Sequence, residues 1–235
     1  MFRLPWRKAG KVLQEKLDLI DFAFSRFALV SMADLGGVWG VQGAYTFQTL
    51  TKRSVQRACL VDTDLTEEVV ARAAEFPALE LISGNFGSPA VAAKIGKIDA
   101  VLLFDVLLHQ VAPNWDDILA MYANQCRCFI VYNQQWVGEG DVVRLLELGE
   151  EEYFRNVPHN RSVPPYLELF ERLDEIHPQH GRSWRDVHHI WQWGISDAAL
   201  EKAMERLGFT LALKRNFGRF GRLDRFENHG FVYVK

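Results

Sequence analysis

The sequence of 235 residues predicts a single α/β domain, a three-layer sandwich with a mostly parallel seven-stranded sheet between two layers of helices. Three observations support this fold class. Short apolar segments alternate with helix-like segments over residues 27–133, a glycine-rich turn follows the first apolar segment, and the last two strands have no helix between them. Strict alternation is typical of a parallel sheet covered on both faces, and the closing strands are expected to pair antiparallel.

The first strand and the turn after it carry the most informative motif. Residues 27–33 are mostly apolar, which favours a short buried strand over a helix, and a helix is expected at residues 43–52. The turn between them reads Asp34-Leu35-Gly36-Gly37-Val38-Trp39-Gly40. Glycines allow backbone conformations and close approaches that a side chain would forbid. The turn therefore predicts a nucleotide-type site at the carboxyl end of the first strand.

Turn and cap residues delimit the remaining elements. Pro77 ends the second predicted helix after the glycine turn, Ser196 caps the last helix, and Gly208 ends it. Residues 1–28 are expected to form an N-terminal helical extension, with its helix at residues 11–27 as a candidate homodimer surface. The further strands are expected at residues 57–62, 79–83, 97–103, 126–133, 209–215 and 230–234, and the further helices at residues 65–75, 89–95, 115–125 and 196–207.

Residues 137–195 lack the alternation of strands and helices. The segment holds four of the eight prolines, five of the seven histidines and three of the seven tryptophans. We interpret it as an insertion that forms a substrate lid over the carboxyl ends of the strands, where ligands bind in such sheets.

Composition and charge disfavour several classes of partner. The formal net charge of −3 gives no basic field for nucleic acid, and no apolar stretch is long enough to span a membrane. No secretory signal is expected. The odd number of cysteines favours reduced thiols and a cytoplasmic location, and Cys126 and Cys128 are expected to face the same side of one strand.

Five segments together resemble the class I S-adenosylmethionine-dependent methyltransferases, over roughly residues 29–235. The resemblance implies a Rossmann-like fold with S-adenosylmethionine as the cofactor. In this family the first motif has a glycine where this sequence has Val38, and an aspartate is common where it has Asn85. The segments are Asp34 to Gly40, Val61-Asp62, Gly84-Asn85-Phe86, Ile98 to Val101, and Asp105 to His109.

The resemblance also implies which residues bind the cofactor. Gly36 and Gly40 would line its methionyl and ribose portion, Asp62 would accept the ribose hydroxyls, and Phe86 would pack on the adenine beside Asn85. The full predicted set is Asp34, Gly36, Gly37, Gly40, Asp62, Thr63, Asn85, Phe86 and Asp105.

Methyl transfer requires mainly alignment of the acceptor, because a sulfonium methyl group is already activated. His109 is the candidate general base, since imidazole titrates near neutral pH, and Asp105 is the second candidate catalytic residue. A structural role for His109 in its loop stays open. We predict a small-molecule or carbohydrate-like acceptor with oxygen as the methylated atom.

The insertion supplies the candidate substrate-binding residues Arg182, Trp184, His188 and Trp191. Arginines match anionic groups, and tryptophans stack on sugar or aromatic rings. A metal at the histidines of this segment is not predicted, because adjacent loop histidines more often serve packing. A clamp for an anionic acceptor remains a further alternative, and its members would be Arg155, Arg161, Arg182 and Arg185.

Proteins of the same architecture also serve other functions. A dinucleotide dehydrogenase needs a Gly-x-Gly-x-x-Gly fingerprint, which fails here at Leu35. Pro164-Pro165-Tyr166 resembles a tripeptide of nucleic-acid amino-methyltransferases but follows the wrong strand, so a rigid turn is the better interpretation. A binding module of this fold without catalysis, and an RNA methyltransferase, stay open as alternatives.

Overall fold

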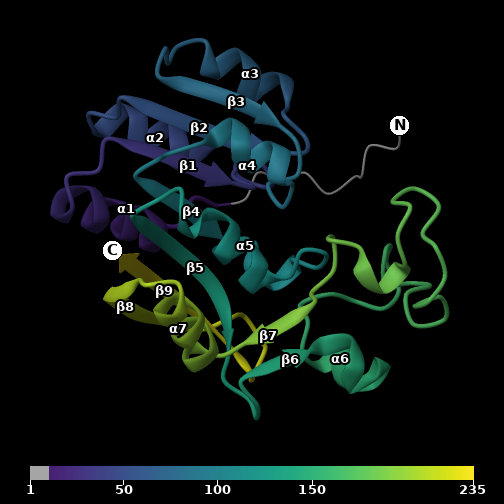
Figure 1. Ribbon diagram of the computed structural model, residues 1–235. Helices are drawn as coiled ribbons and strands as arrows, with labels where there is room; N and C mark the ends of the chain where they lie inside the picture. The colour runs from purple at the N-terminus through teal and green to yellow at the C-terminus, as the bar shows by residue number, and fades with distance from the viewer. Residues whose placement is uncertain (1–10) are drawn as a thin grey trace.

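The computed structural model describes residues 11–235, which form a seven-stranded sheet between two layers of helices (Figure 1). The strand order is β3-β2-β1-β4-β5-β9-β8. The first five strands are parallel, and β9 is antiparallel to both β5 and β8. The predicted sheet and its antiparallel hairpin are confirmed. The strands are β1 (Ser31–Leu35), β2 (Arg57–Asp62), β3 (Leu79–Ser83), β4 (Ala100–Phe104), β5 (Cys128–Trp136), β8 (Thr210–Arg219) and β9 (Phe226–Val234).

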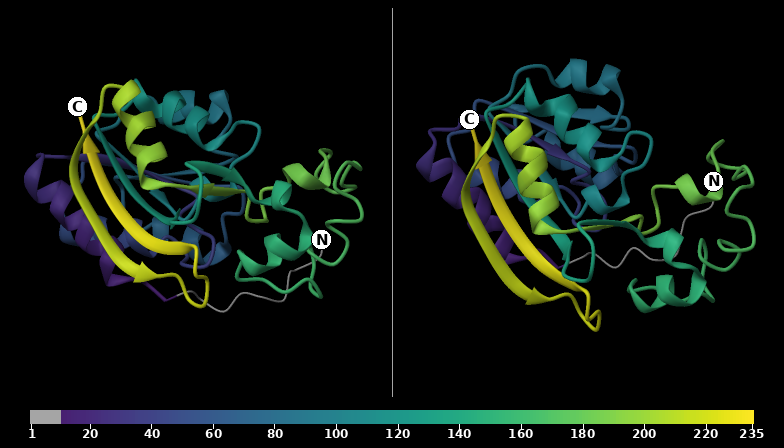
Figure 2. Two further views of the ribbon diagram at one scale, coloured as in Figure 1. Left: turned by 90° about the horizontal axis from the view of Figure 1, so that it is seen from below. Right: turned by 60° about the horizontal axis from the view of Figure 1, so that its bottom comes forward.

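Helices cover both faces of the sheet. On one face α1 (Gln14–Arg26) and α2 (Ala44–Lys52) pack against a buried cluster that includes Leu19, Met32 and Ile130. On the other face α4 (Pro89–Ile95), α5 (Trp115–Ala123) and α7 (Asp197–Arg206) share a second cluster. α3 (Glu67–Ala73) lies beside β3, and its Val69 packs in one cluster with Phe47 of α2. Figure 2 shows the long β8–β9 hairpin along one edge, with α1 and α7 on its two sides.

Several strands differ from their predicted bounds. β1 begins at Ser31 and includes Asp34 and Leu35, whereas the apolar run predicted residues 27–33. The Asp99 carboxylate accepts hydrogen bonds from the Val30 and Ser31 amides at 2.9 and 3.0 Å, so the chain joins the sheet only there. β5 and β9 are also longer than predicted, because their ladder is continuous from the Cys128–Val234 pair to the Trp136–Phe226 pair.

The three cysteines are free and buried. The prediction that Cys126 and Cys128 face the same side is wrong, because β5 starts only at Cys128 and the two side chains join different core clusters. Burial raises the pKa of each thiol, to about 12 for these two and about 11 for Cys59. Thiols held protonated in this way are structural rather than reactive.

The segment 137–195 forms a structured unit beyond the carboxyl ends of the parallel strands (Figure 1). Its two-stranded antiparallel sheet was missed, because strands of three residues leave no periodicity to detect. Its own apolar cluster includes Tyr153, Leu169 and Ile190. The elements are β6 (Val142–Arg144), η2 (Leu145–Leu148), α6 (Glu150–Arg155), η3 (Trp184–Asp186) and β7 (Trp193–Ile195).

The predicted extension over residues 1–28 lies partly outside the described residues, since these begin at residue 11. Its helix is present as α1, which buries Leu17, Ile20 and Phe24 against the sheet. Within the described residues, none of the helices has the length and apolar character needed to cross a membrane.

Candidate functional site

Asp62, at the end of β2, holds the glycine turn through its carboxylate. Its Oδ2 accepts hydrogen bonds from the amides of Val38 at 3.0 Å and Trp39 at 3.2 Å, and its Oδ1 accepts one from the Asp64 amide at 3.2 Å. The side chain is buried. Because a carboxylate offers about four acceptor sites, these three bonds leave acceptor capacity for one further donor.

Asp34 lies beneath the turn. It is buried, and the Thr46 hydroxyl donates to its Oδ2 at 2.7 Å. Burial raises the pKa of Asp34 to about 6, although the hydrogen bond from Thr46 opposes that shift. A Cβ on Gly37 would lie 2.4 Å from the Asp34 carboxyl carbon. Gly37 is therefore required by its contact with Asp34, and Asp34 supports the turn from below.

The other two glycines differ in their surroundings. Gly36 has φ +78°, and a Cβ there would lie 2.9 Å from Val106 Cγ1 and 3.4 Å from Phe86 Cε1. Gly40 has φ +76° and faces open space, next to Trp39, which is 83% exposed. The backbone of the turn is thus exposed at Gly40, whereas at Gly36 it is close to the side chains of Phe86, after β3, and Val106, after β4.

The loop after β3 is fixed to α5. The Asn85 Oδ1 accepts from the Gly87 amide at 2.8 Å, and the Phe86 carbonyl accepts from the Tyr122 hydroxyl at 2.7 Å. The Asn85 oxygen accepts one bond in this turn and keeps a second lone pair, while its amide nitrogen is available to donate to a ligand. That nitrogen can only donate a hydrogen bond, whereas the aspartate common at this position can accept one.

Asp105, directly after β4, is paired with a lysine that sequence reasoning missed. Its Oδ2 contacts the Lys16 ammonium, and its Oδ1 accepts from Gln134 Nε2 at 2.7 Å. Lys16 is buried, with its nitrogen 4.8 Å from the centre of the Tyr132 ring. The available signal was its spacing, because Lys16 shares the buried stripe of α1 with Ile20.

His109 connects the sheet to the insertion. Its Nδ1 lies 2.7 Å from the Ile190 carbonyl oxygen, and its ring meets that of Trp191 edge to face. A carbonyl only accepts, so Nδ1 carries the proton of the neutral ring and Nε2 keeps a free lone pair. Burial lowers the pKa of His109, although the bond to Ile190 opposes the shift. The neutral form with a basic Nε2 is the state at pH 7.

The predicted substrate-binding residues do not form one surface. Trp184 and Trp191 are buried in the cluster of the insertion, and Arg182 Nη1 contacts His188 Nε2. Of the proposed anion clamp, three members are paired with acids: Arg155 with Glu151 and Glu152, Arg161 with Glu150, and Arg185 with Glu147.

The histidine rings of the insertion lie close together in tilted pairs. The rings of His177 and His180 are 4.5 Å apart between centroids, and those of His180 and His189 are 5.1 Å apart. Among residues 11–235, no group of three His, Cys, Asp or Glu side chains is arranged to hold a metal ion.

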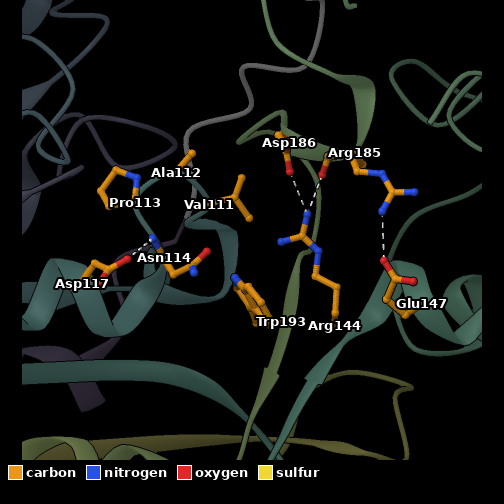
Figure 3. Close-up of a pocket in the computed structure, with 10 residues that line it drawn as sticks. All are labelled: Val111, Ala112, Pro113, Asn114, Asp117, Arg144, Glu147, Arg185, Asp186 and Trp193. Atoms are coloured by element: carbon orange, nitrogen blue, oxygen red, sulfur yellow. Dashed lines mark hydrogen bonds and ion pairs between the residues drawn. The ribbon is translucent and has the colours of Figure 1, made fainter. Parts of the chain in front are cut away.

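A cleft of about 520 Å³ lies between the segment after β4 and the β6–β7 sheet of the insertion (Figure 3). Pro113, Asn114 and Asp117 line one side, and Glu147 and Arg185 line the other. Between them lie Arg144 and Trp193. This volume falls within the range of small-molecule sites, about 300–1,000 Å³.

Comparison with known proteins identifies the fold. No family model matches the chain, and neither does any curated protein. Solved structures of methyltransferases match nearly all of it, so the chain has the class I methyltransferase fold. The fold class predicted from the sequence is confirmed.

Three of these structures illustrate the similarity. Magnesium protoporphyrin IX methyltransferase from Synechocystis, with SAH bound, has 14% identity and a TM-score of 0.58 over 94% of this chain and 82% of its own. The N-terminal domain of EvdMO1, with SAH and D-fucose, has 16% identity and a TM-score of 0.56 over 98% and 90%. The 1,6-didemethyltoxoflavin-N1-methyltransferase from Burkholderia thailandensis has 11% identity and a TM-score of 0.56 over 94% and 77%. The chain spans 44% of the chain in a further structure, that of EvdMO1.

Proposed function

We propose that this protein is an S-adenosylmethionine-dependent methyltransferase that acts on a small-molecule or carbohydrate-like acceptor, with oxygen as the methylated atom. The observation that carries the proposal is the glycine turn held by Asp62 at the carboxyl ends of β1 and β2, with Phe86 and Asp105 beside it. Ligands bind at this edge in open α/β sheets.

The residues present fit the cofactor. Gly36 and Gly40 expose backbone, Asp62 retains acceptor capacity for a ribose hydroxyl, and Phe86 offers an aromatic ring. Asn85 would donate to an adenine nitrogen. We assign Thr63, next to Asp62, to the same site. The cofactor supplies an electrophilic methyl group on a sulfonium when bound.

Two observations support a small acceptor. The cleft of about 520 Å³ suits a small molecule, and it opens between the segment after β4 and the insertion. The similar EvdMO1 domain was crystallised with D-fucose, and another similar structure is that of an O-methyltransferase family protein. We therefore assign residues 137–195 to acceptor binding and coverage.

In this proposal His109 is the general base. Its Nε2 accepts the proton of the acceptor hydroxyl, while the bond from Nδ1 to Ile190 holds the ring in place. Asp105 has both carboxylate oxygens engaged by Lys16 and Gln134. It therefore orients groups at the transfer site and is a poor candidate for the base.

Isothermal titration calorimetry with S-adenosylmethionine and S-adenosylhomocysteine tests the donor. We expect both to bind, and the Asp62→Ala variant to lose at least ten-fold in affinity. If neither ligand binds the wild-type protein, the proposal is refuted. Turnover is then measured as S-adenosylhomocysteine formed over a panel of hydroxylated acceptors, and binding without turnover on any of them would favour a module that has lost catalysis.

A further inference from the structure

The cleft of Figure 3 is built from residues that neither the cofactor set nor the predicted substrate set includes. Its central pair is Arg144 on β6 and Trp193 on β7, whose guanidinium and indole are 4.8 Å apart. The Trp193 Nε1 donates to the Gln110 carbonyl at 2.7 Å. This bond ties the cleft to the segment after β4, only five residues beyond Asp105.

Arg144 is held in place and still has donors to offer. Its side chain is only 16% exposed, and Nη2 donates to the Arg185 carbonyl at 2.7 Å and to Asp186 Oδ1 at 3.2 Å. Its Nη1 and Nε make no hydrogen bond to any other residue in the range 11–235. A fixed guanidinium with unused N–H groups is a ready donor for a ligand oxygen.

The charges of the cleft disfavour an anionic ligand. Two guanidinium groups and three carboxylates line it, which leaves one net negative charge. Arg185 is engaged by Glu147 at 3.0 Å, and Arg144 by Asp186. An added carboxylate or phosphate would thus compete with acids already in place, because each arginine already has its counter-charge.

We infer that this cleft binds a neutral, hydroxyl-rich ring, such as a hexose unit, as the part of the acceptor remote from the methylated atom. Each hydroxyl both donates and accepts, which matches the guanidinium and amide donors of Arg144 and Asn114 and the carboxylate acceptors of Asp117 and Asp186. The Pro113 ring and the exposed part of the Trp193 indole, which is partly covered by Arg144, provide apolar surface for the C–H face of such a ring. The inference rests on the proposed function and specifies its acceptor.

Three probes that differ in one group measure this preference. D-galactose, D-galacturonate and D-galactosamine are titrated into the wild-type protein with ¹⁵N-labelled tryptophans, and the Trp193 indole signal is assigned with Trp193→Phe. We expect D-galactose to shift that signal and to bind at least ten-fold more tightly than D-galacturonate, and D-galactosamine to bind no more tightly than D-galactose. Equal binding, or tighter binding of D-galacturonate, would overturn the inference.

A matched pair of variants locates the ligand. Arg144→Met should weaken D-galactose binding at least five-fold. Arg172→Met is the control, because Arg172 also lies over an indole, that of Trp184 at 5.2 Å, but outside the cleft. Unfolding midpoints of both variants show whether they fold. An equal loss in both variants contradicts the assignment, and the wild-type titration stands even if Arg144→Met fails to fold.

Calorimetry with S-adenosylmethionine on the same sample separates this inference from the proposed function. If the protein binds the cofactor and shows no preference for the neutral sugar, the cleft assignment fails alone. If it binds D-galactose at Trp193 and no cofactor, the proposed function fails, and with it the role of the cleft as an acceptor site.

Discussion

The carboxyl edge of the sheet and the insertion hold their polar side chains in different ways. At the edge, Asp62 is bound by main-chain amides of the glycine turn and Asp34 by the buried Thr46 hydroxyl, so the two carboxylates fix the turn and α2. In the insertion, arginines pair with acids near the surface and histidine rings contact one another. The edge is therefore held by buried hydrogen bonds, whereas the insertion combines its apolar cluster with polar pairings that solvent and protons can weaken.

This difference matches the proposed function, in which the edge binds the cofactor and the insertion binds the acceptor. A cofactor of constant shape suits an edge whose backbone is fixed by short hydrogen bonds, while acceptors vary and suit a segment that can be replaced without disturbing the sheet. His109 belongs to both regions, because it follows β4 and bonds the Ile190 carbonyl.

The largest effect is expected where the two regions meet. His109→Ala should lower turnover by about 100-fold or more, because the base is lost. His109→Asn is the matched control, since its amide nitrogen can still donate to Ile190 while no basic Nε2 remains. If His109 is the base, both variants should lose turnover, which is measured as the initial rate. Recovery of turnover in His109→Asn would instead show that the histidine is structural.

Within the edge, two glycines a few residues apart should respond differently. Gly37→Ala places a Cβ 2.4 Å from the Asp34 carboxyl carbon and should lower the free energy of unfolding by about 3 kcal/mol. Gly40→Ala meets no atom within 4 Å, and its positive φ should cost about 1 kcal/mol. Urea unfolding measures both. Equal losses would mean that the turn is not built around Asp34.

The ion pair between Asp105 and Lys16 should contribute measurably to stability. Lys16→Met leaves this carboxylate without its counter-charge and should lower the free energy of unfolding by about 2 kcal/mol, less than for a fully buried pair because Asp105 is 37% exposed. Asp105→Asn added to that variant should recover part of the loss, since no unpaired charge then remains. Additive losses in chemical denaturation would contradict the coupling.

The smallest expected effect is a loss of stability at low pH that is confined to the insertion. Burial lowers the pKa of His159 and His188 to about 4, below the unfolded value of 6.5. The unfolded chain then binds more protons, so stability of the insertion falls as the pH drops through 6.5, by about 1–2 kcal/mol for each of these histidines between pH 7 and 5. Hydrogen exchange followed by mass spectrometry should show faster exchange over residues 159–191 at pH 5.

His229 provides the internal control for that measurement. Burial works against its charged form, but hydrogen bonds to Asp197, at 2.8 Å, and to Glu227 raise the pKa of His229 overall. Its contribution to stability is present at low pH and is lost only as the pH rises through the folded value. β9 should stay protected at pH 5, and a parallel loss there would show that acid destabilises the whole domain instead.

The sequence by itself determined the elements whose signals are local. Apolar runs and turn residues gave β2, β3 and α4 with their observed bounds, and the glycine turn and the terminal hairpin were likewise foreseen. These features follow from short-range periodicity and backbone preference, which a chain carries in any context. Placing Asp34 and Asp62 at one edge required only the rule that parallel strands end together.

Only the tertiary structure decided which side chains meet. Lys16 reaches Asp105 across 89 residues, and the cleft brings Asn114 of one segment to Arg144 and Trp193 of another. Cys126 and Cys128 lie on opposite faces because the start of β5 is set by its neighbours. Partners so distant in sequence are selected by packing and by the need to pair buried charges, and local patterns carry no record of them.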